Sequence, residues 1–329
     1  MLHDDIVLIA AIAGSTFAGV ILPAAGRLIE PYILVWLGAL LFLNLLRLNP
    51  SDLVAVFKKP RQLVVLSIIK VVALPAGMYA LAYVVYEPFA LPILLLSGIS
   101  TGLGAPFVVN LIGGQLPLVI GMIIITSVAV PFVLPAIVYA FVRSQFEIPL
   151  LQMMFLLSIA LFTPLAAGWL TKKYFPAGSK FADKNSFHLS LIFIVLINWG
   201  MFAKFAGFFY SEQMFLLQTV AAAFLCYAAY CIVGYAGTTG SLQEKRAGLI
   251  ATSYVNNVLV AVFAFQFFGS QVAALAALYN IPYYIGIIAI KLFLLRADHV
   301  KVLLLPQQIT PDCKILTFVY FQSLRQSNI

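Results

Sequence analysis

The chain has 329 residues, of which 63% are hydrophobic and only 9% are charged, and its formal net charge at pH 7 is +8. Soluble domains carry roughly 25% charged residues, so this composition excludes an ordinary soluble protein and predicts an all-α polytopic membrane protein in a lipid bilayer. The excess of Lys and Arg falls in the loops between the apolar runs. It therefore indicates membrane topology rather than binding to nucleic acid.

Apolar runs of about 20 residues recur along the chain and predict ten transmembrane helices. The first run follows an acidic start without a basic segment, so we expect no cleavable signal peptide. The predicted spans are 6–25, 31–47, 61–86, 88–112, 116–142, 150–171, 187–209, 213–236, 245–268 and 271–295.

Ten crossings place most basic residues on one side of the membrane. The positive-inside rule then puts both termini in the cytoplasm, and we expect a bacterial-type inner or plasma membrane. The basic residues of this side are Lys58, Lys59, Arg61, Lys172, Lys173, Lys180, Lys184, Lys245, Arg246, Arg296 and Lys301. The opposite loops hold Arg27 and Arg143 beside Glu30, Glu87, Glu147 and Glu212, and every Asp and Glu is predicted in a loop or terminus.

The third span carries Lys70 about midway along its length, with Pro75 shortly after it. A charge at the bilayer centre costs at least about 2.5 kcal/mol, so such residues usually face a cavity or a partner. Three roles follow for Lys70: it holds an anionic substrate, carries a proton, or supplies a fixed cation. A structural lysine that binds helix-end carbonyl groups is the alternative.

The fourth span contains the stretch STGLGAPFVVN, in which three helix-breaking residues occur close together. Glycine loosens a helix, and proline removes an N–H and clashes with the preceding turn. In secondary transporters such breaks form the substrate and ion site near the midplane. The candidate site residues of this span are Thr101, Gly102, Gly104, Pro106 and Asn110. A simple proline kink is the alternative.

The ninth span contains the polar stretch TSYVNNV, which begins at Thr252. Adjacent asparagines point in different directions on a helix, so the pair favours an unwound segment over hydrogen bonding between helices. The candidate site residues of this span are Thr252, Ser253, Asn256 and Asn257.

The two halves of the predicted span pattern correspond. Each half has five spans and an irregular fourth member, and an odd number of spans requires the second copy to be inverted. We therefore expect inverted repeats at 1–143 and 144–296, followed by a cytoplasmic tail, 297–329, without an assigned role. Nucleotide-binding and metalloprotease signatures are absent, so we expect neither an enzyme nor a cofactor or metal ion.

Several stretches resemble the bile acid–sodium symporter family. They include PYILVWLGALLFLNLLRLNPSDL, KVVALPAG, NLIGGQLPL, VPFVLPAI and AGLIATSYVNNVLVA. The resemblance covers Pro31–Ala136 and the ninth span, and leaves out the tail. It implies ten helices in two inverted repeats, a panel and a core domain, and fourth and ninth helices that break and cross beside the substrate.

The sequence departs from the family pattern at the sodium ligands that the resemblance implies. The glutamine of the third span falls on Lys70, and the glutamate of the ninth span falls on Thr252. The serine and asparagine of the fourth-span motif become Ala105 and Pro106. A fixed ammonium repels sodium, so we predict that two-sodium coupling is not preserved.

The sequence thus predicts a secondary active transporter of a small organic anion or amphipathic solute, which works by alternating access without sodium. Lys70 replaces a bound cation in this hypothesis, and its protonation offers coupling to a proton gradient. One alternative is a sodium symporter that uses neutral oxygen ligands from Ser253, Asn256 and Asn257. The other is a non-transporting membrane sensor or scaffold.

Overall fold

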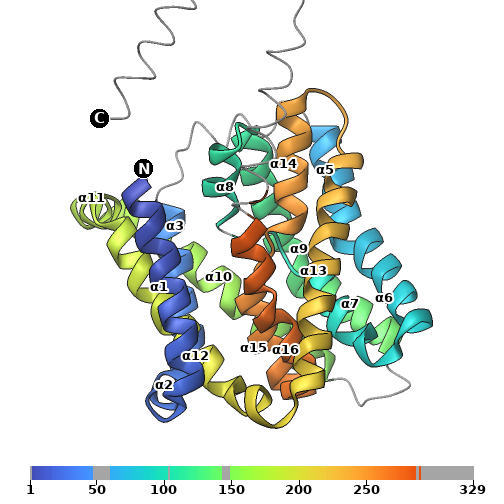
Figure 1. Cartoon of the computed structure of the whole chain (residues 1–329). Coiled ribbons are helices and arrows are strands. Elements are labelled where there is room, and N and C mark those ends of the chain that lie inside the picture. The colour runs from blue at the N-terminus through green and yellow to red at the C-terminus, as the bar shows by residue number, and fades with distance from the viewer. Residues whose placement is uncertain (1, 47–59, 103, 143–148, 287–288, 290–329) are drawn as a thin grey trace, which may run out of the picture. The chain divides into compact units, whose positions relative to one another are not determined.

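The structure is a computed structural model that describes residues 2–46, 60–102, 104–142, 149–286 and 289. The elements in chain order are α1 (Leu2–Ile21), α2 (Pro23–Ile29), η1 (Glu30–Tyr32), α3 (Ile33–Leu46), α5 (Pro60–Ile68), η2 (Ile69–Ala73), α6 (Leu74–Val85), η3 (Glu87–Phe89), α7 (Ala90–Gly98), α8 (Ala105–Leu111), α9 (Leu116–Val142), α10 (Leu150–Tyr174), α11 (Pro176–Lys184), α12 (Ser186–Ser211), α13 (Gln213–Ala236), α14 (Leu242–Ser253), α15 (Asn257–Phe268) and α16 (Ser270–Leu278). Met1–Ile287 form one compact unit (Figure 1). The predicted tail, 297–329, and the end of the predicted tenth span lie outside the described residues.

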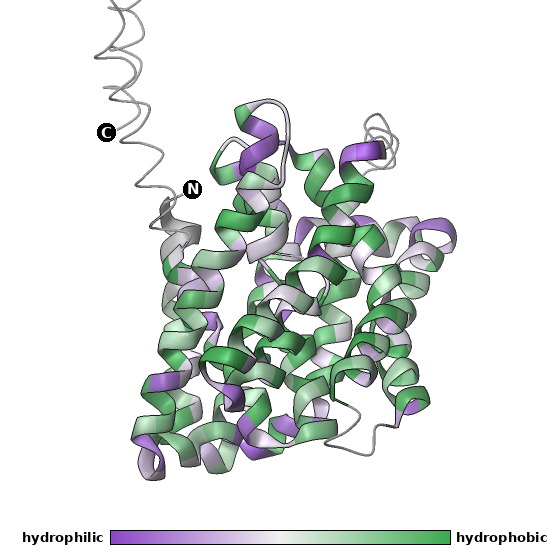
Figure 2. Cartoon of the chain, turned by 90° about the vertical axis from the view of Figure 1, so that its right-hand side faces the viewer, coloured by the Kyte–Doolittle hydropathy of each residue, from purple (hydrophilic) through white to green (hydrophobic). Residues whose placement is uncertain are grey.

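Six segments among the described residues are long and apolar enough to cross a membrane. They are Pro23–Leu43, Pro60–Val85, Leu116–Val142, Leu150–Tyr174, Ser186–Ser211 and Gln213–Ala236. Shorter apolar helices cover Ala10–Ile21, Glu87–Gly98 and Asn257–Phe268. Figure 2 shows that hydrophobic residues make up most of the length of the helices. The protein is therefore a polytopic helical membrane protein.

The helices of the compact unit pack in two groups. The first group, here called the panel helices, consists of α1, α2, α3, α10 and α12, which contact one another. The second group, the core helices, comprises α5 to α9 and α13 to α16. Figure 1 shows the panel helices around α1 and α12 beside the core helices around α13, α14 and α16. The two groups are joined mainly by packing of α10 on α9, and also by contacts of α12 with α13 and α16 and of α15 with α3 and α10.

Close packing of the panel helices depends on glycine. A Cβ on Gly19 would lie 2.7 Å from the Cβ of Phe202, and one on Gly26 would overlap the Cβ of Ala203. Because glycine has no side chain, the backbones of α1 and α2 pack directly against α12 at these positions.

The structure corrects the predicted position of two glutamates. Glu30 lies in η1, inside the apolar segment Pro23–Leu43, and pairs with Lys204 at an N–O distance of 2.5 Å. Glu244 is buried in the first turn of α14, where it forms a capping box with Ser241. A carboxylate in a first helical turn is stabilised by the free N–H groups and the helix dipole. The prediction that every Asp and Glu lies in a loop or terminus is therefore wrong for both residues.

Candidate functional site

The first interruption separates α7 from α8. Gly102 is required there, because a Cβ would lie 2.7 Å from the Val255 carbonyl oxygen and 3.1 Å from that of Tyr254. The Gly102 N–H instead donates a 2.7 Å hydrogen bond to the Tyr254 oxygen. Pro106 lies in the first turn of α8, where a missing N–H leaves no intrahelical partner unpaired.

The second interruption separates α14 from α15 and pairs with the first. Tyr254 leaves the helical conformation with φ −88° and ψ 79°. The Asn256 N–H donates to the Ser100 carbonyl oxygen at 3.0 Å, and Thr101 forms an antiparallel bridge with Val255. Each break thus satisfies backbone groups that the other break frees, as non-helical backbone at membrane depth requires.

Lys70 lies in the π-helical turn η2, within the long segment Pro60–Val85. Pro75 follows this turn, and a widened turn relieves the clash of its ring with the preceding carbonyl group. The Lys70 side chain is 0% exposed, and its Nζ donates a 2.6 Å hydrogen bond to the Ser97 carbonyl oxygen. Nζ also lies 5.8 Å from the centre of the Tyr230 ring. The amine therefore points at the interrupted end of α7.

The oxygen that Lys70 contacts lies at the negative end of a half-helix. The last four carbonyl groups of a helix have no partner within the helix. Ser97 is the second-last residue of α7, so no N–H of this helix reaches its carbonyl group, which accepts from the ammonium instead. The Ser97 hydroxyl donates within α7, to the Ile93 oxygen at 2.5 Å. At the end of α8, Arg246 Nη1 donates to the Ile112 carbonyl oxygen at 3.0 Å. Each half of this interrupted helix thus ends at a basic side chain from another helix.

The three predicted hydroxyl residues bind the backbone at the breaks. Thr101 Oγ1 donates to the Ala251 carbonyl oxygen at 2.7 Å, which ties the first interruption to α14. Thr252 Oγ1 donates to the Tyr230 carbonyl oxygen at 2.8 Å, and Ser253 Oγ donates at 2.7 Å to a carbonyl group one turn earlier in α14. Because Lys70 lies over the ring of Tyr230, this residue connects the lysine to the second interruption.

The two adjacent asparagines have different partners. Asn256 caps α15, because its Oδ1 accepts a 3.3 Å hydrogen bond from the Leu259 N–H. Asn257 Nδ2 donates to Asn280 Oδ1 at 2.7 Å, and the buried Asn280 Nδ2 has no partner among the described residues. The prediction of an unwound segment at these asparagines is confirmed for residues 254–256.

Two predicted site residues of the fourth span lie away from this buried network. Gly104 is exposed beside Tyr283, whose hydroxyl oxygen would overlap a Cβ at this position. Asn110 is exposed on α8, and no side-chain hydrogen bond joins it to either break among the described residues. The structure therefore brings together Lys70, Thr101, Gly102 and the second interruption, and leaves Asn110 outside.

Sequence analysis missed a cluster of tyrosines around the second interruption. The ring centroids of Tyr254 and Tyr283 lie 4.5 Å apart, and those of Tyr230 and Tyr279 lie 6.0 Å apart. The hydroxyl groups of Tyr227 and Tyr254 lie 3.1 Å from each other. A signal was present in the sequence, because Tyr227 and Tyr230, and likewise Tyr279 and Tyr283, are spaced to share one helix face.

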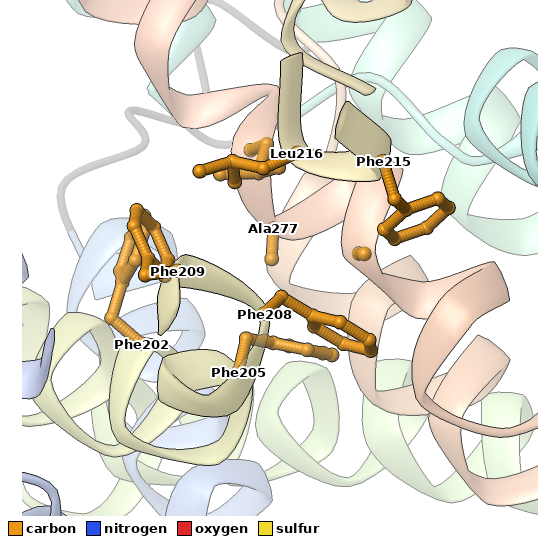
Figure 3. A pocket seen from close by; sticks show the side chains of 9 residues that line it. Phe202, Phe205, Phe208, Phe209, Phe215, Leu216 and Ala277 are labelled. Carbon is orange, nitrogen blue, oxygen red and sulfur yellow. The ribbon is translucent and has the colours of Figure 1, made fainter. Parts of the chain in front are cut away.

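An apolar pocket lies apart from the two interruptions, between α12, α13 and α16 (Figure 3). Its lining residues are Phe202, Phe205, Phe208, Phe209, Phe215, Leu216, Ala274, Ala277 and Leu278. None of them carries a polar side chain or belongs to the predicted site. The pocket therefore offers no side-chain ligand for an ion, and it marks a contact region between a panel helix and core helices.

The fold and site define a polytopic membrane protein in which two interrupted helices pair beside a buried lysine. Residues 32–211 match the model of the sodium bile acid symporter family, and the chain belongs to this family. The match includes Lys70 and the first interruption, and ends before the second. A comparison with curated proteins finds no match. Membership indicates a membrane transporter of the symporter kind.

Proposed function

We propose that the protein is a secondary active transporter that moves a small organic anion or amphipathic solute by alternating access without bound sodium. The Lys70 ammonium takes the place of the cation. The observation that carries this proposal is the 2.6 Å hydrogen bond from the fully buried Lys70 Nζ to the Ser97 carbonyl oxygen. A positive charge is thereby held at the interrupted end of α7, as an exchangeable cation would be.

Electrostatics supports the loss of sodium binding. Two unit positive charges about 4 Å apart repel by roughly 4 kcal/mol at an effective dielectric constant near 20. This energy corresponds to about a thousandfold loss of affinity for a sodium ion next to the ammonium. Sodium coupling through Asn256 would in addition compete with the hydrogen bond that its Oδ1 accepts from the Leu259 N–H.

The proposed architecture has ten spans in two inverted repeats, 1–143 and 144–296. Its support is that the interruptions fall in the fourth and ninth predicted spans and pair with each other. The described basic residues of α10, α11 and α14 support cytoplasmic termini by the positive-inside rule. Movement of the panel helices against the core helices would then open the interruptions to each side in turn.

The preference for a negatively charged solute follows from the groups at the breaks. The N-terminus of α15, a helix of 12 residues, begins at the second interruption and favours negative charge through its dipole. Lys70 adds a buried cation near the first interruption, and no described Asp or Glu is its partner.

Uptake into proteoliposomes tests this proposal. A panel of radiolabelled carboxylates and sulfonates is offered with either sodium or N-methylglucamine outside, and with or without an inward proton gradient. We expect uptake to be equal with either cation outside, to be lost in Lys70→Ala, and to be retained in Lys245→Ala, a control in the first turn of α14. Strict sodium dependence contradicts the cation replacement, and an unaffected Lys70→Ala variant contradicts the role of this residue. Failure to take up any anion favours the sensor or scaffold alternative.

A further inference from the structure

A basic and aromatic surface lies at the junction of α10, α11 and α12, apart from the interruptions. The segment 172–184 contains four lysines and one aspartate. Phe175 and Phe181 are 69% and 67% exposed, and Trp169 and Tyr174 are 60% and 59% exposed. We call this surface the α11 surface, and it consists of Trp169, Lys173, Tyr174, Phe175, Lys180, Phe181 and Lys184.

The position of α11 in the chain places this surface at the edge of the membrane. The helix begins two residues after the end of α10 and ends two residues before α12, and both flanking helices are long enough to cross a bilayer. Figure 1 shows α11 at the same end of the compact unit as the starts of α5 and α14. A short helix held between two spans in this way lies along the lipid headgroups.

The side chains of α11 suit that position. Lys180, Phe181 and Lys184 are all exposed. Lys184 follows Lys180 by four residues and Phe181 by three, so it neighbours both of them on one helix face. Lys173 Nζ lies 4.9 Å from the centre of the Trp169 ring and 5.1 Å from that of the Tyr174 ring. Exposed aromatic rings bury their apolar parts at the interface, while lysine stems lift their ammonium groups to the headgroup level.

We propose that the α11 surface binds the phosphate groups of anionic phospholipids. Charge complementarity supports this assignment, because Lys173, Lys180 and Lys184 are all exposed. Lipid phosphates lie at the depth inferred above for α11. The aromatic residues fix the depth of the helix, and the lysines select anionic over zwitterionic headgroups. This inference does not depend on the proposed transport function.

Native mass spectrometry of the full chain, released from nanodiscs of equimolar phosphatidylglycerol and phosphatidylcholine, tests the proposal. We expect retained lipid to be mainly phosphatidylglycerol in the wild type. The double variant Lys180→Gln/Lys184→Gln should retain it about 30-fold less tightly, since each lysine near an anionic surface contributes about fivefold. Lys180→Arg/Lys184→Arg, which keeps both charges, should restore the preference.

The matched control is Arg61→Gln/Lys245→Gln, which removes two charges from the starts of α5 and α14. It should retain phosphatidylglycerol as the wild type does. Equal retention of both lipids by the wild type would overturn the proposal, as would equal loss in the control and the α11 variant. Elution at the wild-type volume in size-exclusion chromatography checks that each variant is folded.

Discussion

Replacing Lys70 by glutamine should create a response to sodium that the wild type lacks. The change removes the ammonium that donates to the Ser97 carbonyl oxygen at 2.6 Å, and supplies a neutral side-chain oxygen to the same buried position. It also removes a repulsion of about 4 kcal/mol against a cation about 4 Å away, which corresponds to roughly a thousandfold gain in sodium affinity.

Thermal unfolding in detergent measures this gain. Sodium at ten times its Kd stabilises the folded state by about 1.4 kcal/mol, whereas a site a thousandfold weaker gives no detectable effect at that concentration. We therefore expect Tm to rise by a few degrees in Lys70→Gln when sodium replaces N-methylglucamine, and to remain unchanged in the wild type and in Lys245→Gln. A sodium-dependent rise in the wild type would refute the reasoning, and its absence in Lys70→Gln would show that no latent cation site exists.

Four further substitutions, two at the interruptions and two away from them, test the packing of the helices. Gly102→Ala should lower the free energy of unfolding by about 1–3 kcal/mol and abolish uptake, because its Cβ would meet the Val255 carbonyl group at 2.7 Å. Gly77→Ala has no heavy atom within 4 Å of its Cβ and should preserve or slightly raise Tm. Asn257→Leu should cost about 1–3 kcal/mol by leaving Asn280 without its 2.7 Å partner, and a double-mutant cycle with Asn280→Leu should show positive coupling. Ser241→Ala removes the cap of α14 and should cost about 1 kcal/mol, measured as a fall in Tm without a change in sodium response.

The positions of the long helices and of the two interruptions could be predicted from the sequence. Apolar runs locate the six long apolar segments of the described residues, because each must match the bilayer thickness, and the glycines and Pro106 locate the first break. The full set of ten spans stays a prediction. The second break follows from Asn256 and Asn257. On a continuous buried helix their side chains would point in different directions, so one neighbouring helix could not supply hydrogen-bond partners to both. Both breaks depend on local residue chemistry, which a sequence displays directly.

The hydrogen-bond partners of the site residues could not be predicted from the sequence. Lys70 contacts a backbone carbonyl group, and any residue type at Ser97 would present the same oxygen. The requirement for glycine at Gly102 comes from the approach of residues about 150 positions away in the chain. Lys204 of α12 is only 20% exposed and pairs with Glu30, about 170 positions earlier in the chain. Such contacts depend on the packing of distant segments, which no local pattern encodes.

Equilibrium binding of radioactive sodium to the purified wild-type protein tests the central claim most directly. If the Lys70 ammonium occupies the position of a bound cation beside α7, the protein should show no saturable sodium binding at any sodium concentration. Saturable binding of one or more sodium ions per chain, unaffected by Lys70→Ala, would contradict the account.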